Sequence, residues 1–138
     1  MERASAGNVL MLRLDHDEDI LESISKAVAP ERSTLMLVLG IGMIHDFEIG
    51  YFDSGRYIRK KFQEPHELLS MQGSVSVEGE PRVHVHLTVA DRDHKAFGGH
   101  LLSGRAWMSN EIGFLRLEGH RSARILDPEK NVGVLRIG

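Results

Sequence analysis

Three histidines offer the clearest chemistry in this sequence: His84, His86 and His100. The first two are separated by one residue in a segment whose apolar residues alternate, and this predicts a strand with both imidazoles on one face. On a strand their Cα atoms lie roughly 6.5 Å apart, so both rings can converge on one ion. His100 follows Gly98-Gly99, a pair that we expect to bend the chain and to aim a third ring at the same point.

Three neutral histidines suit a divalent transition metal, zinc first, with nickel, cobalt, iron or copper allowed on affinity alone. Three protein ligands would leave a fourth position for water, a substrate or a residue from another subunit. The alternative is that these are surface or hydrogen-bonded histidines, because a bare His-x-His pair often arises by chance. The third histidine after the glycine pair favours the metal site, with His45 and His94 as fallback ligands.

No catalytic residue can be assigned from a motif. Gly40-x-Gly42 lacks the third glycine of a dinucleotide fingerprint, and Gly98-Gly99-His100 lacks the Lys-Ser/Thr ending of a phosphate loop. There is no Gly-x-Ser-x-Gly elbow and no cysteine nucleophile. Four carboxylates are candidate general acids or bases, or hydrogen-bond partners of the histidines, although each alone is more typical of a surface charge: Glu48, Asp53, Glu67 and Glu111.

The densest basic run is a candidate nucleic-acid contact: Arg56, Arg59, Lys60 and Lys61, with Tyr57 and Phe62 interleaved. Nucleic-acid binding needs cations that neutralise phosphates, and aromatic rings can add stacking. The alternative is a solvated strand edge whose lysines discourage aggregation. A net charge of −3, from 20 acidic and 17 basic side chains, gives no general attraction to DNA, so a local patch would have to provide it.

Length and composition favour one domain. A chain of 138 residues can bury roughly two thirds of its unfolded surface. We expect a flexible lead-in over residues 1–8 and a single domain over residues 9–138. No apolar run approaches the ~20 residues of a membrane span, and the N-terminus lacks the order of a secretion signal. With no cysteine, these features favour a cytoplasmic protein without a membrane partner.

The expected elements are one helix and many strands. The helix should start at Asp15 or Asp17, bury a stripe of Ile20, Leu21, Ile24 and Val28, and stop at Pro30. Strands are expected over 9–14, 34–44, 47–53, 56–62, 67–77, 82–90 and 105–118, and near the C-terminus. Short turns between them predict an α+β fold with a largely antiparallel sheet. Ile112, Phe114, Leu115 and Leu117 place apolar groups on both faces of one strand, which either intrachain burial or another subunit could cover.

An ordered set of segments resembles the plants-and-prokaryotes-conserved (PPC) domain family, over roughly Leu10 to Ile137. The landmarks are Gly40-Ile41-Gly42, Ile49-Gly50-Tyr51-Phe52-Asp53, Pro65 to Ser74, His84-Val85-His86-Leu87, Asp91-Arg92-Asp93 and Gly98-Gly99-His100-Leu101. The resemblance implies a PPC-like α+β domain, with an antiparallel sheet, that assembles as a homotrimer. The histidine pattern resembles the stand-alone prokaryotic members, where it looks like a metal site.

The resemblance also implies a role connected with DNA. Plant members carry AT-hook segments and act through protein–protein contacts, whereas prokaryotic members are often described as DNA-binding proteins. This chain has no Arg-Gly-Arg AT hook, which counts against direct minor-groove binding. We therefore expect a homotrimeric binding or regulatory module, with DNA or a DNA-bound protein as its partner. A metal-dependent enzyme acting on a small substrate is the alternative.

Overall fold

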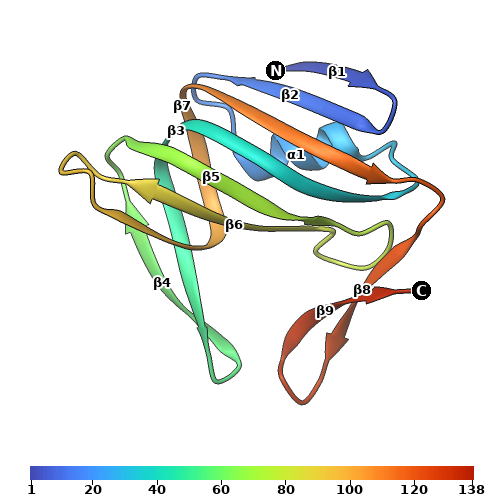
Figure 1. The fold of residues 1–138 in the computed structure, drawn as a ribbon. Helices are drawn as coiled ribbons and strands as arrows, with labels where there is room; N and C mark the ends of the chain where they lie inside the picture. The colour runs from blue at the N-terminus through green and yellow to red at the C-terminus, as the bar shows by residue number, and fades with distance from the viewer.

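The computed structural model describes residues 1–138 and shows one helix and nine strands (Figure 1). In chain order the elements are β1 (Glu2–Ala6), β2 (Val9–Asp15), α1 (Ile20–Val28), β3 (Thr34–Asp53), β4 (Arg56–Phe62), β5 (His66–Val75), β6 (Val83–Ala90), β7 (Ala96–Leu117), β8 (Ser122–Asp127) and β9 (Val132–Ile137). Every strand ladder is antiparallel. The expected α+β fold, with a largely antiparallel sheet and one N-terminal helix, is confirmed.

Two long strands organise the sheet. β7 pairs with β2, β3 and β6, and β3 pairs with β4, β5 and β7. Since β5 also pairs with β6, the strands β3, β5, β6 and β7 form a closed circuit of hydrogen-bonded neighbours. Register shifts interrupt the β3–β7 ladder, for example between Leu37 and Leu39 and between Gly42 and Met43. Such bulges bend the strands, and this bending lets the circuit close.

The core lies between the sheet and α1. Leu10, Leu12 and Leu14 alternate along β2 and are at most 1% exposed, while α1 contributes Ile20 and Ile24 from its buried face. Burying an aliphatic side chain of this size contributes about 2 kcal/mol. The apolar face of the helix therefore holds it against the sheet, and in Figure 1 the helix lies behind the strands.

The helix starts later than we expected. Its N-cap is Asp19, whose Oδ1 accepts a hydrogen bond of 2.9 Å from the backbone N–H of Glu22, rather than Asp15 or Asp17. Asp17 cannot serve because its φ is +68°, a left-handed conformation outside the extended range of an N-cap. Pro30 follows two residues after the last helical residue, as expected.

Three other expectations differ from the structure. Residues 2–6, expected to be part of a flexible lead-in, form β1, which pairs with β2 although all five residues are exposed. The segments expected as separate strands over 34–44 and 47–53 form the single bulged strand β3. Gly98 and Gly99 do not bend the chain but lie inside β7. In the first two cases the pairing of the backbone to a neighbouring strand overrides the local pattern.

Two hairpins extend from the same side of the sheet. One consists of the end of β3 and β4, and the other of β8 and β9, which form a separate two-stranded sheet. Figure 1 shows both projecting downward with a space between their ribbons. The helix α1 lacks the length and hydropathy needed to cross a bilayer.

Candidate metal centre

The three predicted histidines lie together on adjacent strands. His86 of β6 is the direct partner of His100 of β7, and His84 lies two residues earlier on the same face of β6. Their ring centroids are 4.9 to 5.4 Å apart. One nitrogen from each ring can be chosen so that all three lie within 4.8 Å of one another. The alternation of β6 and the β6–β7 register therefore build the cluster.

The glycines before His100 position it by allowing close packing rather than by bending. A Cβ on Gly98 would lie 2.1 Å from the carbonyl oxygen of Leu87, and one on Gly99 would lie 2.9 Å from the carbonyl oxygen of Gly50. Both distances are too short for a side chain, so β7 needs glycine to run this close to β3 and β6. His100 then pairs with His86 on one side and Gly50 on the other.

One pair of ring nitrogens has the spacing expected around a transition metal. The Nε2 atoms of His84 and His86 are 3.2 Å apart. Two nitrogens bound to one tetrahedral zinc at 2.0–2.1 Å lie about 3.3 Å apart, so the observed spacing suits a shared ion. Nδ1 of His100 is buried without a hydrogen-bond partner, a state that costs free energy unless a ligand relieves it.

The surroundings keep two of the rings neutral. Burial lowers the pKa of His84 to about 4, helped by its neighbours Arg124 and His86. Burial is also the main reason that the pKa of His100 is lowered to about 4. The neighbours His84, His86 and Arg124 lower it further. Neutral imidazole is the form that binds metals, so both rings have lone pairs available at pH 7.

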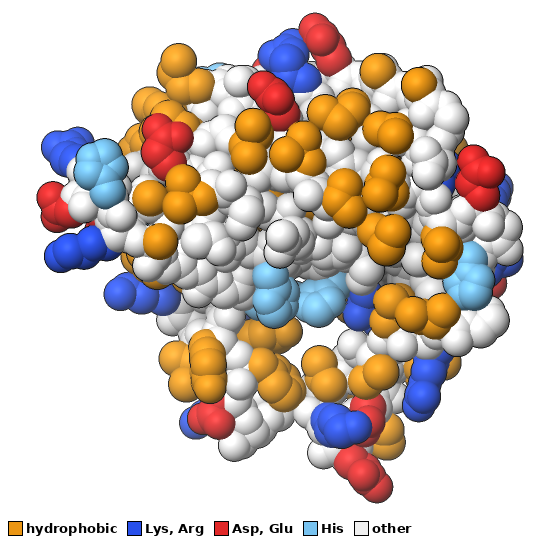
Figure 2. All heavy atoms as spheres, in the orientation of Figure 1, with side chains coloured by type: hydrophobic (Ala, Val, Ile, Leu, Met, Phe, Trp, Pro, Cys, Tyr) orange, Lys and Arg blue, Asp and Glu red, His pale blue; other side chains and the backbone are white.

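A pocket of about 180 Å³ adjoins the cluster, between the two hairpins. Figure 2 shows histidine side chains at the upper end of the hollow between the two hairpins that project downward. The pocket is lined by Phe52, Tyr57, Pro81, His84, His100, Arg124, Asn131, Val132 and Gly133. The ring of Tyr57 stacks on His100 with centroids 4.7 Å apart. Sequence reasoning placed Tyr57 in the basic run and did not single out Arg124, because no local pattern connects either residue to the histidines.

The four candidate carboxylates do not gather at the histidines. None of Glu48, Asp53, Glu67 and Glu111 lines the pocket. Glu48 is instead bound at both oxygens by the guanidinium of Arg59, at 2.8 and 2.9 Å, and this contact lowers its pKa.

The two fallback ligands lie elsewhere. The buried His45 packs against Trp107, and His94 is in the exposed loop between β6 and β7. Neither belongs to the cluster of three histidines, so the structure brings together the first-choice ligands alone.

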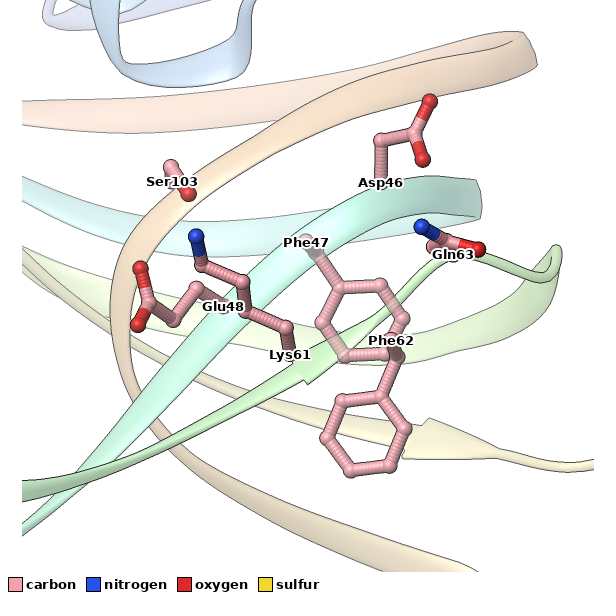
Figure 3. A pocket seen from close by; sticks show the side chains of 7 residues that line it. All are labelled: Asp46, Phe47, Glu48, Lys61, Phe62, Gln63 and Ser103. Atoms are coloured by element: carbon pink, nitrogen blue, oxygen red, sulfur yellow. The ribbon is translucent and has the colours of Figure 1, made fainter.

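The basic run forms β4, an edge strand of the large sheet. Strand alternation places Arg56 and Lys60 on one face and Arg59 and Lys61 on the other. Lys61 is the cross-strand partner of Glu48, and Figure 3 shows these two side chains side by side. The second face is therefore partly neutralised, and the run does not form one continuous basic surface within a single chain.

A second pocket, of about 260 Å³, lies beside this face (Figure 3). It contains Asp46, Phe47, Glu48, Lys61, Phe62, Gln63 and Ser103, but no histidine. The stacked rings of Phe47 and Phe62 form its apolar wall. It is larger than the histidine pocket, but of its two carboxylates Glu48 is already bound by Arg59, and it lacks the converging imidazoles.

The class of protein is thus an antiparallel α+β protein with a three-histidine cluster at the mouth of a pocket. The family model of the Plants and Prokaryotes Conserved (PCC) domain matches residues 1–117. The chain belongs to this family, called PPC above, as its sequence landmarks predicted. No curated protein matches the chain.

Solved structures share the fold over almost the whole chain. A PPC protein from Pyrococcus horikoshii is 28% identical, with a TM-score of 0.84 over 96% of this chain and 93% of that one. A protein from Archaeoglobus fulgidus described as metal-containing is 27% identical, with a TM-score of 0.82 over 96% and 95%. A candidate DNA-binding protein from Ralstonia eutropha is 25% identical, with a TM-score of 0.86 over 99% and 96%.

Proposed function

We propose that this PPC-domain protein is a module that binds one divalent metal, zinc first, through His84, His86 and His100. The convergence of three imidazoles, two of which have their Nε2 atoms 3.2 Å apart, carries this proposal. The similarity to the metal-containing protein from Archaeoglobus fulgidus supports it. A bound metal would supply a Lewis-acid centre with an open fourth position.

The protein's own residues prepare this site. The β6–β7 register holds the rings at one point, and burial keeps His84 and His100 unprotonated. Tyr57 covers one face of His100 and limits its rotation. These contacts bring the ligands close, so binding a metal would need the ring nitrogens to converge from within 4.8 Å of one another to about 3.3 Å.

The second part of the proposal is assembly as a cytoplasmic homotrimer through an apolar sheet face. Met36, Val38, Ile41 and Leu117 are 40–49% exposed, whereas their neighbours Leu35 and Leu37 are buried toward the helix. Figure 2 shows apolar side chains spread over this front face, opposite α1. Contiguous exposed apolar surface of this kind marks a protein contact. Sedimentation should give a trimer for the wild type and a smaller species for Val38→Glu.

The third part is a binding or regulatory role linked to DNA or to a DNA-bound protein. Similarity to the candidate DNA-binding protein from Ralstonia eutropha supports it. Arg56 and Lys60 have no carboxylate partner, unlike Arg59, and are available for phosphates. Affinity for duplex DNA should fall steeply as salt rises, and Arg56→Gln/Lys60→Gln should reduce it. If no DNA binds at low salt, the partner is a protein.

A metal-dependent enzyme is the alternative function, favoured by the pocket beside the cluster. Hydrolytic or lyase chemistry usually needs a carboxylate or another base within hydrogen-bond reach of the substrate. The nine residues that line the pocket include no aspartate or glutamate. The binding module is therefore the better-supported function.

Elemental analysis after metal loading and desalting tests the metal centre. We expect about one metal per chain in the wild type and near zero in His84→Ala/His86→Ala. His94→Asn is the matched control, since asparagine tolerates the left-handed backbone of this exposed loop residue, φ +62°. It should keep the full metal content. Equal metal in the double variant and the wild type would refute the ligand set.

A further inference from the structure

Arg124 of β8 is a buried cation without a carboxylate partner. It is 6% exposed, and its Nη1 and Nη2 donate to the carbonyl oxygen of Gly133 at 3.3 Å and the hydroxyl of Ser74 at 2.9 Å. Its Nε is buried and has no partner. By contrast, the partly buried Arg116 binds both oxygens of Glu31. A guanidinium keeps its charge in proteins, so Arg124 is an uncompensated positive charge in the pocket wall.

This charge acts on the same space as the histidines. Arg124 lines the pocket together with His84 and His100, and it lowers the pKa of both rings. A divalent metal would add two positive charges beside it, and no acidic side chain lines the pocket. Buried charges of one sign require a counter-charge nearby. The loaded pocket is therefore complementary to an anion.

The pocket also has an apolar side and a small volume. Phe52, Tyr57 and Val132 supply apolar surface, and the cavity measures about 180 Å³. Pockets for drug-sized molecules are larger, about 300–1,000 Å³. The combination of one guanidinium, one metal position and an apolar wall suits a small organic acid better than a fully hydrated inorganic anion.

The two hairpin tips meet over this pocket. The side-chain amide of Asn131 donates a 2.8 Å hydrogen bond to the carbonyl oxygen of Gly55. Both residues have a positive φ, +53° and +86°, which asparagine and glycine tolerate best. The turns are thus shaped to bring the β8–β9 hairpin against the β3–β4 hairpin.

Arg124 comes from a different part of the chain than the three histidines. The family match covers residues 1–117 and includes all three histidines, whereas the β8–β9 hairpin with Arg124 and Asn131 lies beyond it. Metal binding and ligand selection are therefore divided between two segments.

We propose that the pocket binds a small carboxylic acid, with its carboxylate held by Arg124 and the open position of the metal and its apolar part against Phe52, Tyr57 and Val132. This inference rests on the proposed metal centre. A guanidinium binds carboxylates and phosphates alike, so the test must separate the two.

Cobalt-loaded protein provides the test, because its visible absorption changes when a ligand enters the coordination sphere. We expect saturable spectral changes with isobutyrate and benzoate, weaker binding of acetate, and no change with the neutral isobutyramide. Saturation by inorganic phosphate with no response to any carboxylate would overturn the proposal in favour of a phosphate site.

Variants of Arg124 then test whether this residue binds the carboxylate. Arg124→Gln should bind about one cobalt per chain but weaken carboxylate binding roughly 10- to 100-fold, the effect of losing one charge-assisted contact. Arg124→Lys should restore part of the affinity, and this arm stays informative if the glutamine variant is unstable. Arg82→Gln is the matched control, because Arg82 lies two residues before His84, donates to the backbone carbonyl of Ser76 and does not line the pocket.

The outcomes separate this inference from the metal proposal. Unchanged carboxylate affinity in cobalt-loaded Arg124→Gln would refute the role of Arg124 and leave the metal centre intact. No spectral change with any acid in fully loaded wild-type protein would refute the carboxylate. Failure of the wild type to bind cobalt or zinc would refute the metal centre, and the inference with it.

Discussion

Two clusters in the molecule contain more than one histidine ring, and they differ in where the ring nitrogens point. In the first, His84, His86 and His100 direct nitrogens toward one another. In the second, His16 and His45 stack 5.7 Å apart, with Trp107 edge-on to both rings at 4.8 and 4.9 Å. The ring spacings are similar, so spacing alone does not distinguish the clusters.

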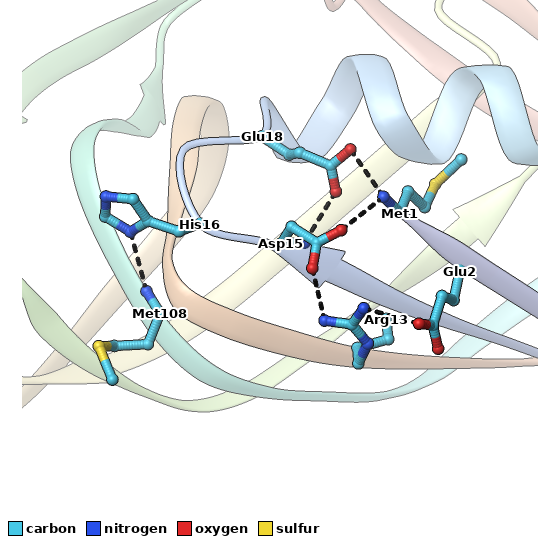
Figure 4. Close-up of polar contacts among 7 residues, drawn as sticks. All are labelled: Met1, Glu2, Arg13, Asp15, His16, Glu18 and Met108. Atoms are coloured by element: carbon cyan, nitrogen blue, oxygen red, sulfur yellow. Dashed lines mark hydrogen bonds and ion pairs between the residues drawn. The ribbon is translucent and has the colours of Figure 1, made fainter.

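In the second cluster the ring nitrogens face carboxylates and backbone rather than one another. Nδ1 of His45 lies 3.3 Å from Asp46, and its Nε2 lies 3.3 Å from Asp17, although Nε2 makes no hydrogen bond there. Nδ1 of His16 accepts a 3.2 Å hydrogen bond from the backbone N–H of Met108 (Figure 4). These contacts join three segments of the chain. The comparison teaches that ring nitrogens converging on one point define a candidate metal site, whereas ring nitrogens that face separate neighbours define a packing unit.

The largest expected effect is stabilisation by zinc. At free zinc about 1,000 times its Kd, the wild type should gain about 4 kcal/mol of folding free energy. His84→Ala/His86→Ala should gain almost nothing, whereas His16→Ala should gain as much as the wild type. Thermal unfolding with and without zinc measures this. An equal loss of zinc response in His16→Ala would erase the distinction between the clusters.

The next effect concerns the glycine that lets the first cluster form. Gly98→Ala should cost about 3 kcal/mol, because the new Cβ would lie 2.1 Å from the carbonyl oxygen of Leu87. Gly119→Ala is the control, since its Cβ would meet no atom and only its positive φ opposes it, at about 1 kcal/mol. Urea unfolding gives both values. Equal costs would show that packing at Gly98 does not position His100.

The two clusters should also contribute differently to the free energy of unfolding of the metal-free protein. His45→Ala should destabilise by about 2 kcal/mol, because it removes a buried ring and leaves Trp107 poorly packed. His84→Ala should change stability by less than about 1 kcal/mol without metal, since its nitrogens have no structural partner beyond His86. Chemical denaturation in the presence of a chelator tests this. The reverse ranking would contradict the assignment of packing to one cluster and binding to the other.

The smallest effect extends the contrast to two arginines: the partly buried Arg116, which has a carboxylate partner, and the buried Arg124, which has none. The hydrogen bond and charge of Arg116 lower the pKa of Glu31. Glu31→Gln should therefore cost about 1–2 kcal/mol at pH 7.

The pH dependence of this cost has a definite sign. A lowered folded-state pKa gives stability that is full above the unfolded value of about 4.3 and is lost as pH falls through the folded value. The difference between wild type and Glu31→Gln should thus shrink by pH 3, measured by urea unfolding at both pH values. A constant difference would mean that the ion pair is not its source.

The parts of the fold and site that depend on local pattern were predictable from sequence. The alternation around His84 and His86 placed both on one face, and the apolar stripe of α1 located the helix. The cap at Asp19 was missed because several aspartates precede the helix, and backbone conformation rather than composition selects among them. The strand at residues 2–6 was missed because all its side chains are exposed.

The parts that depend on long-range register were not predictable. The role of Gly98 and Gly99 is set by the oxygens of Leu87 and Gly50, which lie on two other strands. Arg124 reaches the histidines through the placement of a hairpin that no local signal reveals. A sequence can therefore show which residues could bind a metal, but not which distant cation completes their pocket.

The closed circuit of β3, β5, β6 and β7 has a consequence for folding kinetics. Its closing ladder pairs residues as far apart in sequence as Thr34 and Leu117. Contacts of such high sequence separation form slowly, because the entropy of closing a long loop is lost before the contacts can compensate for it. His100 is held between β3 and β6, so the metal ligands should converge late in folding. A metal would then report on the finished fold rather than help to nucleate it.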